Sequence, residues 1–323
     1  MKLESNRKTL TVLCTSIALV GTMRSLPAQQ AGLLVLEAPA STEAMAYGNT
    51  PYLFSRESGM LFYAPALLSR TSGATAGLQL YGSAGTMATL SGASSWQGGG
   101  LAIGLQYMRY GSDLGSPVAR DSQSVALRSG TVGATELVGS IGYGHQVFGL
   151  ETGLVLKYVE HALNQGGDRT VVFDVGVATD IGPVMVNVVA QNLGSDLDVV
   201  YDPCPTCVVA PPRVRTILEL PRQLSADLSL DDFQVGPLDM FVTARTTWRR
   251  DGQFIPAGGV ELSYWPLTGY TFRLRGGIER VVEDERSPFT FGAAFTGDNI
   301  TLEYAFQGFD GSGNAHRFGL RWR

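Results

Sequence analysis

The chain has 323 residues, of which 16% are charged and 40 are glycine, and its formal net charge at neutral pH is −5. Ordinary globular chains carry about 25% charged residues and about 7% glycine. This composition therefore favours a β-rich protein with many tight turns, and its acidic balance argues against a nucleic-acid partner.

Residues 1–28 are typical of a secretory signal peptide. Three basic residues precede an apolar run over 10–23, and Ala28 supplies a small residue for cleavage. The alternative, a membrane anchor, is less favoured because the run is shorter than the roughly 20 residues that a spanning helix needs. Cleavage removes four basic residues and one acidic residue, so the net charge of the mature chain goes from −5 to −8.

Residues 29–72 lack strand alternation and have helical tendency near 39–47 and 64–69. We expect this segment to form a plug, or hatch, inside the barrel that the rest of the chain predicts. Candidate hatch residues are Phe62, Tyr63 and Pro65. A disordered periplasmic tail is the alternative.

Residues 73–323 contain fourteen candidate strands with period-2 alternation. Their predicted ranges are 74–83, 85–95, 99–111, 132–145, 147–160, 169–179, 182–193, 221–231, 236–249, 255–266, 269–280, 287–297, 299–308 and 315–322.

The segment 299–307 illustrates the pattern, because Ile300 and Leu302 share one face while Thr301 and Glu303 share the other. A soluble β-sandwich would show the same alternation. The connections discriminate, because long polar loops such as 112–131 and 194–220 alternate with short turns, as in outer-membrane barrels. The sequence therefore predicts an all-β fold, a transmembrane antiparallel barrel of about fourteen strands, in contact with the lipid of a Gram-negative outer membrane.

Charged residues recur on the face that we expect to line the lumen. The candidates are Glu151, Lys157, Arg245, Glu261, Arg273, Arg275, Glu303 and Arg321. They could form a polar path or a docking surface for a charged ligand. The other interpretation is an internal network of ion pairs that fills a barrel too wide for side chains to close, and the mixed signs favour it.

The mature chain retains Cys204 and Cys207, which lie close together in the loop 194–220. Export favours a local disulfide, although free thiols or a zinc site are alternatives. The three histidines, at positions 145, 161 and 316, do not form a recognisable catalytic pattern. We predict no catalytic, cofactor-binding or metal site, and no enzymatic activity.

Four short motifs carry a resemblance to a known group. They lie at 38–46, 62–68 and 190–194 and at the Leu220–Pro221 step. In these motifs the chain resembles the PorV/PorQ-type outer-membrane proteins, within the wider FadL-like superfamily of fourteen-stranded barrels. The resemblance implies a barrel with an N-terminal segment folded into it.

The resemblance implies two functions, and the sequence does not separate them. The first is binding or shuttling of secreted protein cargo in type IX secretion, which the long loops favour. The second is a FadL-like channel for hydrophobic small molecules such as long-chain fatty acids. We expect binding or shuttling of protein cargo. The expected domains are a signal peptide (1–28), a hatch (29–72) and a barrel (73–323).

Overall fold

A computed structural model describes residues 33–82, 85–110, 134–163, 166–201, 213–281, 286–309 and 313–323. The predicted signal peptide and both cysteines lie outside the described residues. None of the described helices is long and apolar enough to cross a membrane.

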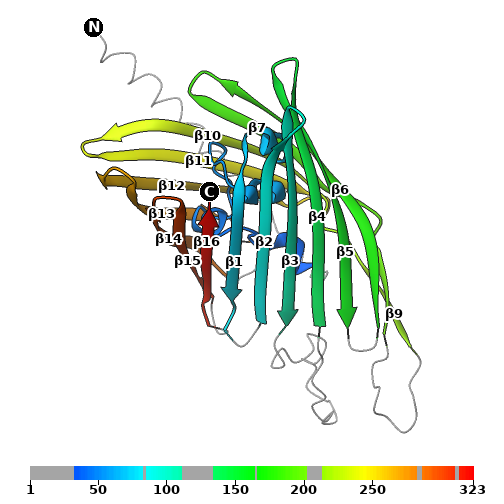
Figure 1. Cartoon of the computed structure of the whole chain (residues 1–323). Coiled ribbons are helices and arrows are strands. Elements are labelled where there is room, and N and C mark those ends of the chain that lie inside the picture. Colours follow the sequence, from blue (N-terminus) through cyan, green and yellow to red (C-terminus); the bar gives the residue numbers. More distant parts are fainter. Residues whose placement is uncertain are drawn as a thin grey trace. The chain divides into compact units, whose positions relative to one another are not determined.

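Fourteen antiparallel strands form a closed ring (Figure 1). They are β1 (Gly73–Leu80), β2 (Gly85–Trp96), β3 (Gly99–Tyr110), β4 (Ala134–Val147), β5 (Leu150–Leu163), β6 (Gly166–Ile181), β7 (Val184–Gly194), β10 (Gln223–Val235), β11 (Leu238–Arg249), β12 (Phe254–Leu267), β13 (Tyr270–Glu279), β14 (Arg286–Gly297), β15 (Ile300–Phe309) and β16 (Ala315–Trp322). Pairing of β1 with β16 closes the ring. The predicted fourteen-stranded barrel is confirmed.

The alternation in β15 has the expected orientation. Ile300 and Leu302 are 51% and 55% exposed on the outer surface, whereas Thr301, Glu303 and Ala305 are buried on the lumenal side. The same division along the other strands gives the barrel an apolar exterior, which is what a hydrocarbon environment requires of every strand in a membrane-spanning barrel.

The two ends of the barrel differ in their connections. At the inner end, two-residue turns join the strands, and in the turn before β5 both Phe148 and Gly149 have positive φ, as a type I′ turn requires. At the outer end, the connections after β3 and β7 are the longest.

The connection after β7 contains two strands that the sequence analysis treated as loop. These are β8 (Leu197–Tyr201) and β9 (Val214–Leu218), which form a hairpin and meet β6 through a single bridge between Gly167 and Val200. The hairpin therefore extends the sheet at the outer end without joining the closed ring.

Residues 33–72 form the hatch, drawn in blue inside the ring of strands in Figure 1. Its elements are short: α2 (Leu34–Glu37), α3 (Thr42–Ala46) and two 3-10 helices, η1 (Ser58–Phe62) and η2 (Pro65–Arg70). Helices this short are unstable alone, so their conformation depends on packing against the wall.

Glycine in the wall allows the hatch backbone to approach closely. A Cβ atom at Gly153 of β5 would lie 2.1 Å from the carbonyl oxygen of Pro65, and one at Gly277 of β13 would lie 2.2 Å from the backbone nitrogen of Gly48. Any other residue at these two positions would push the hatch away from the wall.

Candidate functional site

A buried cluster of charges joins the hatch to strands β12, β13, β15 and β16. Its members, called the hatch cluster below, are Glu43, Glu57, Glu261, Arg273, Arg275, Glu303 and Arg321. Arg275 is its centre, with ion pairs to Glu261 at 2.7 Å, to Glu303 at 2.8 Å and to Glu43 of the hatch at 3.2 Å. Arg321 bonds Glu303 at 3.1 Å and Glu57 of the hatch at 3.3 Å.

Arg317 of β16 ties the hatch to the wall in a different way. Its guanidinium group is fully buried and donates hydrogen bonds to the carbonyl oxygens of Pro39, at 2.9 Å, and Ala40, at 2.6 Å. It also donates to Gln79 of β1 and Thr89 of β2. The planar fork of an arginine suits this simultaneous contact with hatch and wall.

The three remaining predicted lumenal charges also have partners. Glu151 pairs with Arg70 of the hatch at 3.0 Å, Lys157 with Asp174 at 2.7 Å, and Arg245 with Asp227 at 3.3 Å. All eight predicted lumenal residues therefore lie on the inner face in ion pairs, and the structure brings five of them together in the hatch cluster.

The candidate hatch residues lie where the segment meets the wall. Phe62 and Tyr63 are buried with Leu61 and Leu68 in one apolar cluster, and the Tyr63 hydroxyl accepts a hydrogen bond from the backbone of Ala40. Burial raises the pKa of Tyr63, so this hydroxyl keeps its proton. Pro65 begins η2.

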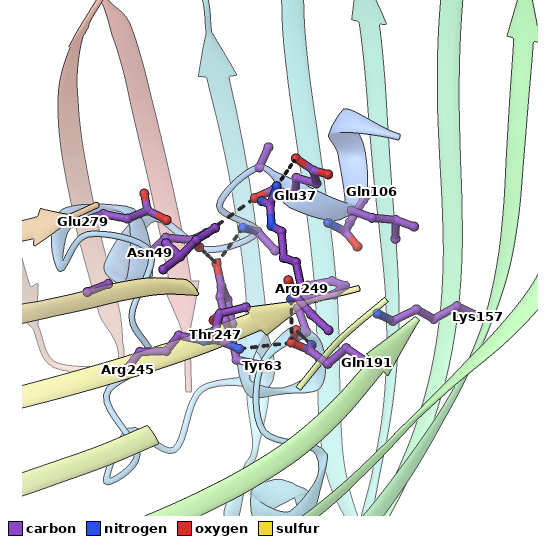
Figure 2. A pocket seen from close by; sticks show the side chains of 17 residues that line it. Glu37, Asn49, Tyr63, Gln106, Lys157, Gln191, Arg245, Thr247, Arg249 and Glu279 are labelled. Atoms are coloured by element: carbon purple, nitrogen blue, oxygen red, sulfur yellow. Dashed lines mark hydrogen bonds and ion pairs between the residues drawn. The ribbon is translucent and has the colours of Figure 1, made fainter. Parts of the chain in front are cut away.

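A polar pocket of about 50 Å³ lies near the outer end, between the hatch and the wall (Figure 2). The wall supplies Gln106 of β3, Lys157 of β5 and Arg245 of β11, while the hatch supplies Asn49 and Tyr63. Further polar lining residues are Glu37, Gln191, Gln223, Thr247, Arg249 and Glu279. The volume is sufficient for a few water molecules or a small polar group.

Each charge in the pocket is neutralised by a neighbour. Figure 2 shows Arg249 reaching Glu37 of the hatch, a contact of 3.2 Å, and Arg245 reaching Gln191. The Arg245 guanidinium also lies 5.4 Å from the ring centroid of Tyr63, a cation–π contact. Glu279 pairs with Arg286 at 2.7 Å.

Beside the pocket, one side of the lumen is apolar. The apolar wall consists of Met87, Met108, Val138, Val159 and Val172, one residue from each of strands β2 to β6, all buried. Leu33 and Val35, at the start of the hatch, and Leu197 and Val199 of β8 pack against it. The lumen thus has a charged cluster on β12, β13, β15 and β16 and an apolar patch on β2–β6, beside the Lys157–Asp174 ion pair of β5 and β6.

Helix α2 covers the apolar wall with only one turn. Besides the Arg249–Glu37 ion pair, two hydrogen bonds hold it: the backbone nitrogen of Val35 donates to Glu136 at 2.7 Å, and Gln106 donates to the carbonyl oxygen of Val35 at 3.1 Å. Since its own four residues give little stability, docking on the wall is what keeps α2 folded.

The apolar wall was not predicted from the sequence. The signal that could have found it lies in β6, where Val171, Val172 and Phe173 interrupt the alternation with three apolar residues in succession. Such a run indicates that both faces of the strand meet apolar surroundings.

Among the described residues, no group of three or more His, Cys, Asp or Glu side chains is arranged to hold a metal ion. His145 and His316 lie near strand ends, where His316 contacts the Tyr304 hydroxyl at 2.8 Å and His145 contacts a backbone carbonyl.

No protein-family model and no curated protein sequence matches this chain. Solved structures do match. The toluene transporter TodX of Pseudomonas putida is similar with a TM-score of 0.55 and 12% identity, over 86% of this chain and 95% of that one.

Two further structures agree with this result. A FadL homologue of Pseudomonas aeruginosa has a TM-score of 0.51 and 10% identity, over 87% of this chain and 97% of its own. The monoaromatic hydrocarbon channel CymD has a TM-score of 0.50 and 12% identity, over 91% and 97%. The fold is therefore that of the FadL-like outer-membrane barrels, and none of these structures is of PorV or PorQ type.

Proposed function

We propose that the protein is a channel of the Gram-negative outer membrane that admits small hydrophobic molecules. The observation that carries this proposal is the apolar wall, a buried surface on β2–β6 against which the start of the hatch, β8 and the segment around Leu218 and Leu220 pack. Apolar side chains inside a membrane barrel give a hydrophobic solute a surface on which to leave water.

The structural neighbours support this function over cargo binding. TodX is described as a toluene transporter and CymD as a monoaromatic hydrocarbon channel. Binding of secreted protein, which the sequence analysis placed first, has one favourable feature, the β8–β9 hairpin with Ile217 67% exposed. Val200 and Val214 of the same hairpin are also exposed, but three apolar side chains on a narrow hairpin are weak support for a protein interface.

In the proposed path a solute enters at the outer end and displaces α2 from the apolar wall. Leu33 and Val35 would leave the wall together, because both lie at one turn of the chain. The hatch cluster and Arg317 contact the hatch further along its chain, at Pro39, Glu43 and Glu57, and hold it in place while its first turn moves.

Replacement of Leu33 by alanine tests the path. Truncating a buried leucine costs about 2 kcal/mol or more, which shifts the docking equilibrium of the helix roughly thirtyfold toward the undocked form. We expect cells that carry the Leu33→Ala variant in their outer membrane to take up radiolabelled naphthalene faster than cells with the wild-type protein.

The same helix offers the control. Leu34 is next to Leu33 but is 37% exposed, so Leu34→Ala should leave the uptake rate at the wild-type value. If neither the wild-type protein nor Leu33→Ala raises naphthalene uptake above that of cells without the barrel, the proposed function is wrong.

A further inference from the structure

We propose that the pocket selects the polar end of the ligand, and that it takes an uncharged hydrogen-bonding group, such as a hydroxyl or an amide, on an apolar body. A carboxylate is disfavoured. This inference rests on the proposed function and specifies which hydrophobic molecules the channel binds.

The charged side chains of the pocket are already paired. The pocket contains three cationic and two anionic lining residues, and each is engaged within the protein: Lys157 with Asp174, Arg245 with Asp227, Arg249 with Glu37, and Glu279 with Arg286. A carboxylate would therefore enter a partly buried site without a free counter-charge. Burial of an unpaired charge is costly.

The pocket offers two hydrogen-bond acceptors, the side-chain oxygens of Gln106 and Gln223. Gln106 and Gln223 each use their side-chain nitrogen, toward Val35 and Gln191 respectively. Their side-chain carbonyl oxygens accept no hydrogen bond from the part of the chain that the structure describes. These oxygens need a donor, which a hydroxyl or amide has and a carboxylate lacks.

The pocket adjoins the apolar wall. Leu36 and Ala38 line it and also pack against the apolar wall. A ligand whose head occupies the pocket therefore has its body directed along the apolar wall, where α2 packs in the structure. The two surfaces together fit an amphiphile with a compact neutral head.

Binding of a matched pair of probes tests the selection. Octanamide and octanoate share the same chain and differ mainly in the charge of the head at neutral pH. With the full barrel in lipid nanodiscs, equilibrium dialysis of each radiolabelled probe, corrected for empty nanodiscs, should give octanoate a Kd at least about tenfold weaker than that of octanamide.

A variant that frees one cation should shift the preference toward octanoate. Glu37→Gln removes the partner of Arg249 while retaining the size of the side chain. Looser docking of α2 would affect both probes alike, so we expect the affinity for octanoate to rise relative to that for octanamide. Glu160→Gln is the matched control, because Glu160 bonds Tyr158 on the outer surface of β5 and should leave both affinities unchanged.

The outcomes separate the two proposals. If the wild-type protein binds octanoate as tightly as octanamide, or more tightly, the neutral-head inference is wrong and the channel function stands. If neither probe binds saturably to the wild-type protein, and naphthalene uptake is also absent, the proposed function fails and this inference fails with it.

Discussion

The titrating residues of the hatch cluster show how buried charges are balanced. Four carboxyl groups meet three guanidinium groups, so one carboxyl group lacks a positive partner of its own. Burial and the adjacent charge of Glu43 raise the pKa of Glu57 well above its ordinary value, despite Arg321. Burial opposes ionisation of Glu43 as well, but Arg321 and Arg275 prevail and lower its pKa. The pKa values of the two carboxyl groups therefore shift in opposite directions, upward for Glu57 and downward for Glu43.

This arrangement predicts that alkaline pH weakens the docking of the hatch. The pKa of Glu57 is raised in the folded protein above its ordinary value of 4.5. Its contribution to the free energy of unfolding is therefore fully present below pH 4.5 and is lost as pH rises through the folded pKa. Glu43 has a lowered pKa, so its contribution to the free energy of unfolding is lost as pH falls through that pKa, below the range of this effect. The neutral variant Glu57→Gln should remove this part of the pH dependence.

Urea unfolding of the protein in lipid bilayers, measured from pH 5 to pH 9, checks the effect. The free energy of unfolding of the wild-type protein should fall relative to that of Glu57→Gln as pH rises, and Glu160→Gln should keep the wild-type slope. A constant difference between wild type and Glu57→Gln across this range would show that Glu57 is ionised throughout.

The lumenal charges were predictable one by one, but their partners were not. Period-2 alternation places Arg275, Glu303 and Arg321 on the inner face. Nothing local connects Arg275 with Glu43, which lies 232 positions away in the sequence. Such contacts depend on how the hatch packs inside the barrel. The sequence of the hatch has no periodic pattern, so its position in the lumen could not be predicted.

At the scale of elements, the fourteen strands of the ring follow from alternation and turn chemistry, and the predicted ranges agree with the observed ones to within a few residues. β8 and β9 were missed because each has only five residues in a long polar connection. Helix α2 was missed because one turn is too short to show a helical period.

The position of a residue along a strand should set the cost of a charge on the outer surface. Leu156 lies in the middle of β5 and Leu150 at its inner end, and both are about half exposed. We expect Leu156→Arg to reduce the free energy of unfolding in bilayers by about 2–4 kcal/mol and Leu150→Arg by about 0–1 kcal/mol. Equal costs at the two positions would contradict a membrane location for β5.

At the scale of the whole described chain, the hatch divides the lumen into two environments. Strands β12, β13, β15 and β16 contribute the charged residues that fix the hatch, whereas β2–β6 contribute the apolar wall beneath its first turn. A single segment is thus anchored on one side and held by apolar packing on the other. The sequence predicts a barrel with a hatch, but this asymmetry depends on packing across the lumen.

The proposed channel requires that a hydrophobic solute reach the apolar wall. Photolabelling with an apolar diazirine probe, followed by peptide mass spectrometry of the barrel in bilayers, measures this directly. The probe should label Met87 and Met108, and excess naphthalene should suppress that labelling while labelling of lipid-facing Leu156 persists. Labelling confined to the lipid-facing surface, with Met87 and Met108 unmodified, would contradict the proposed channel.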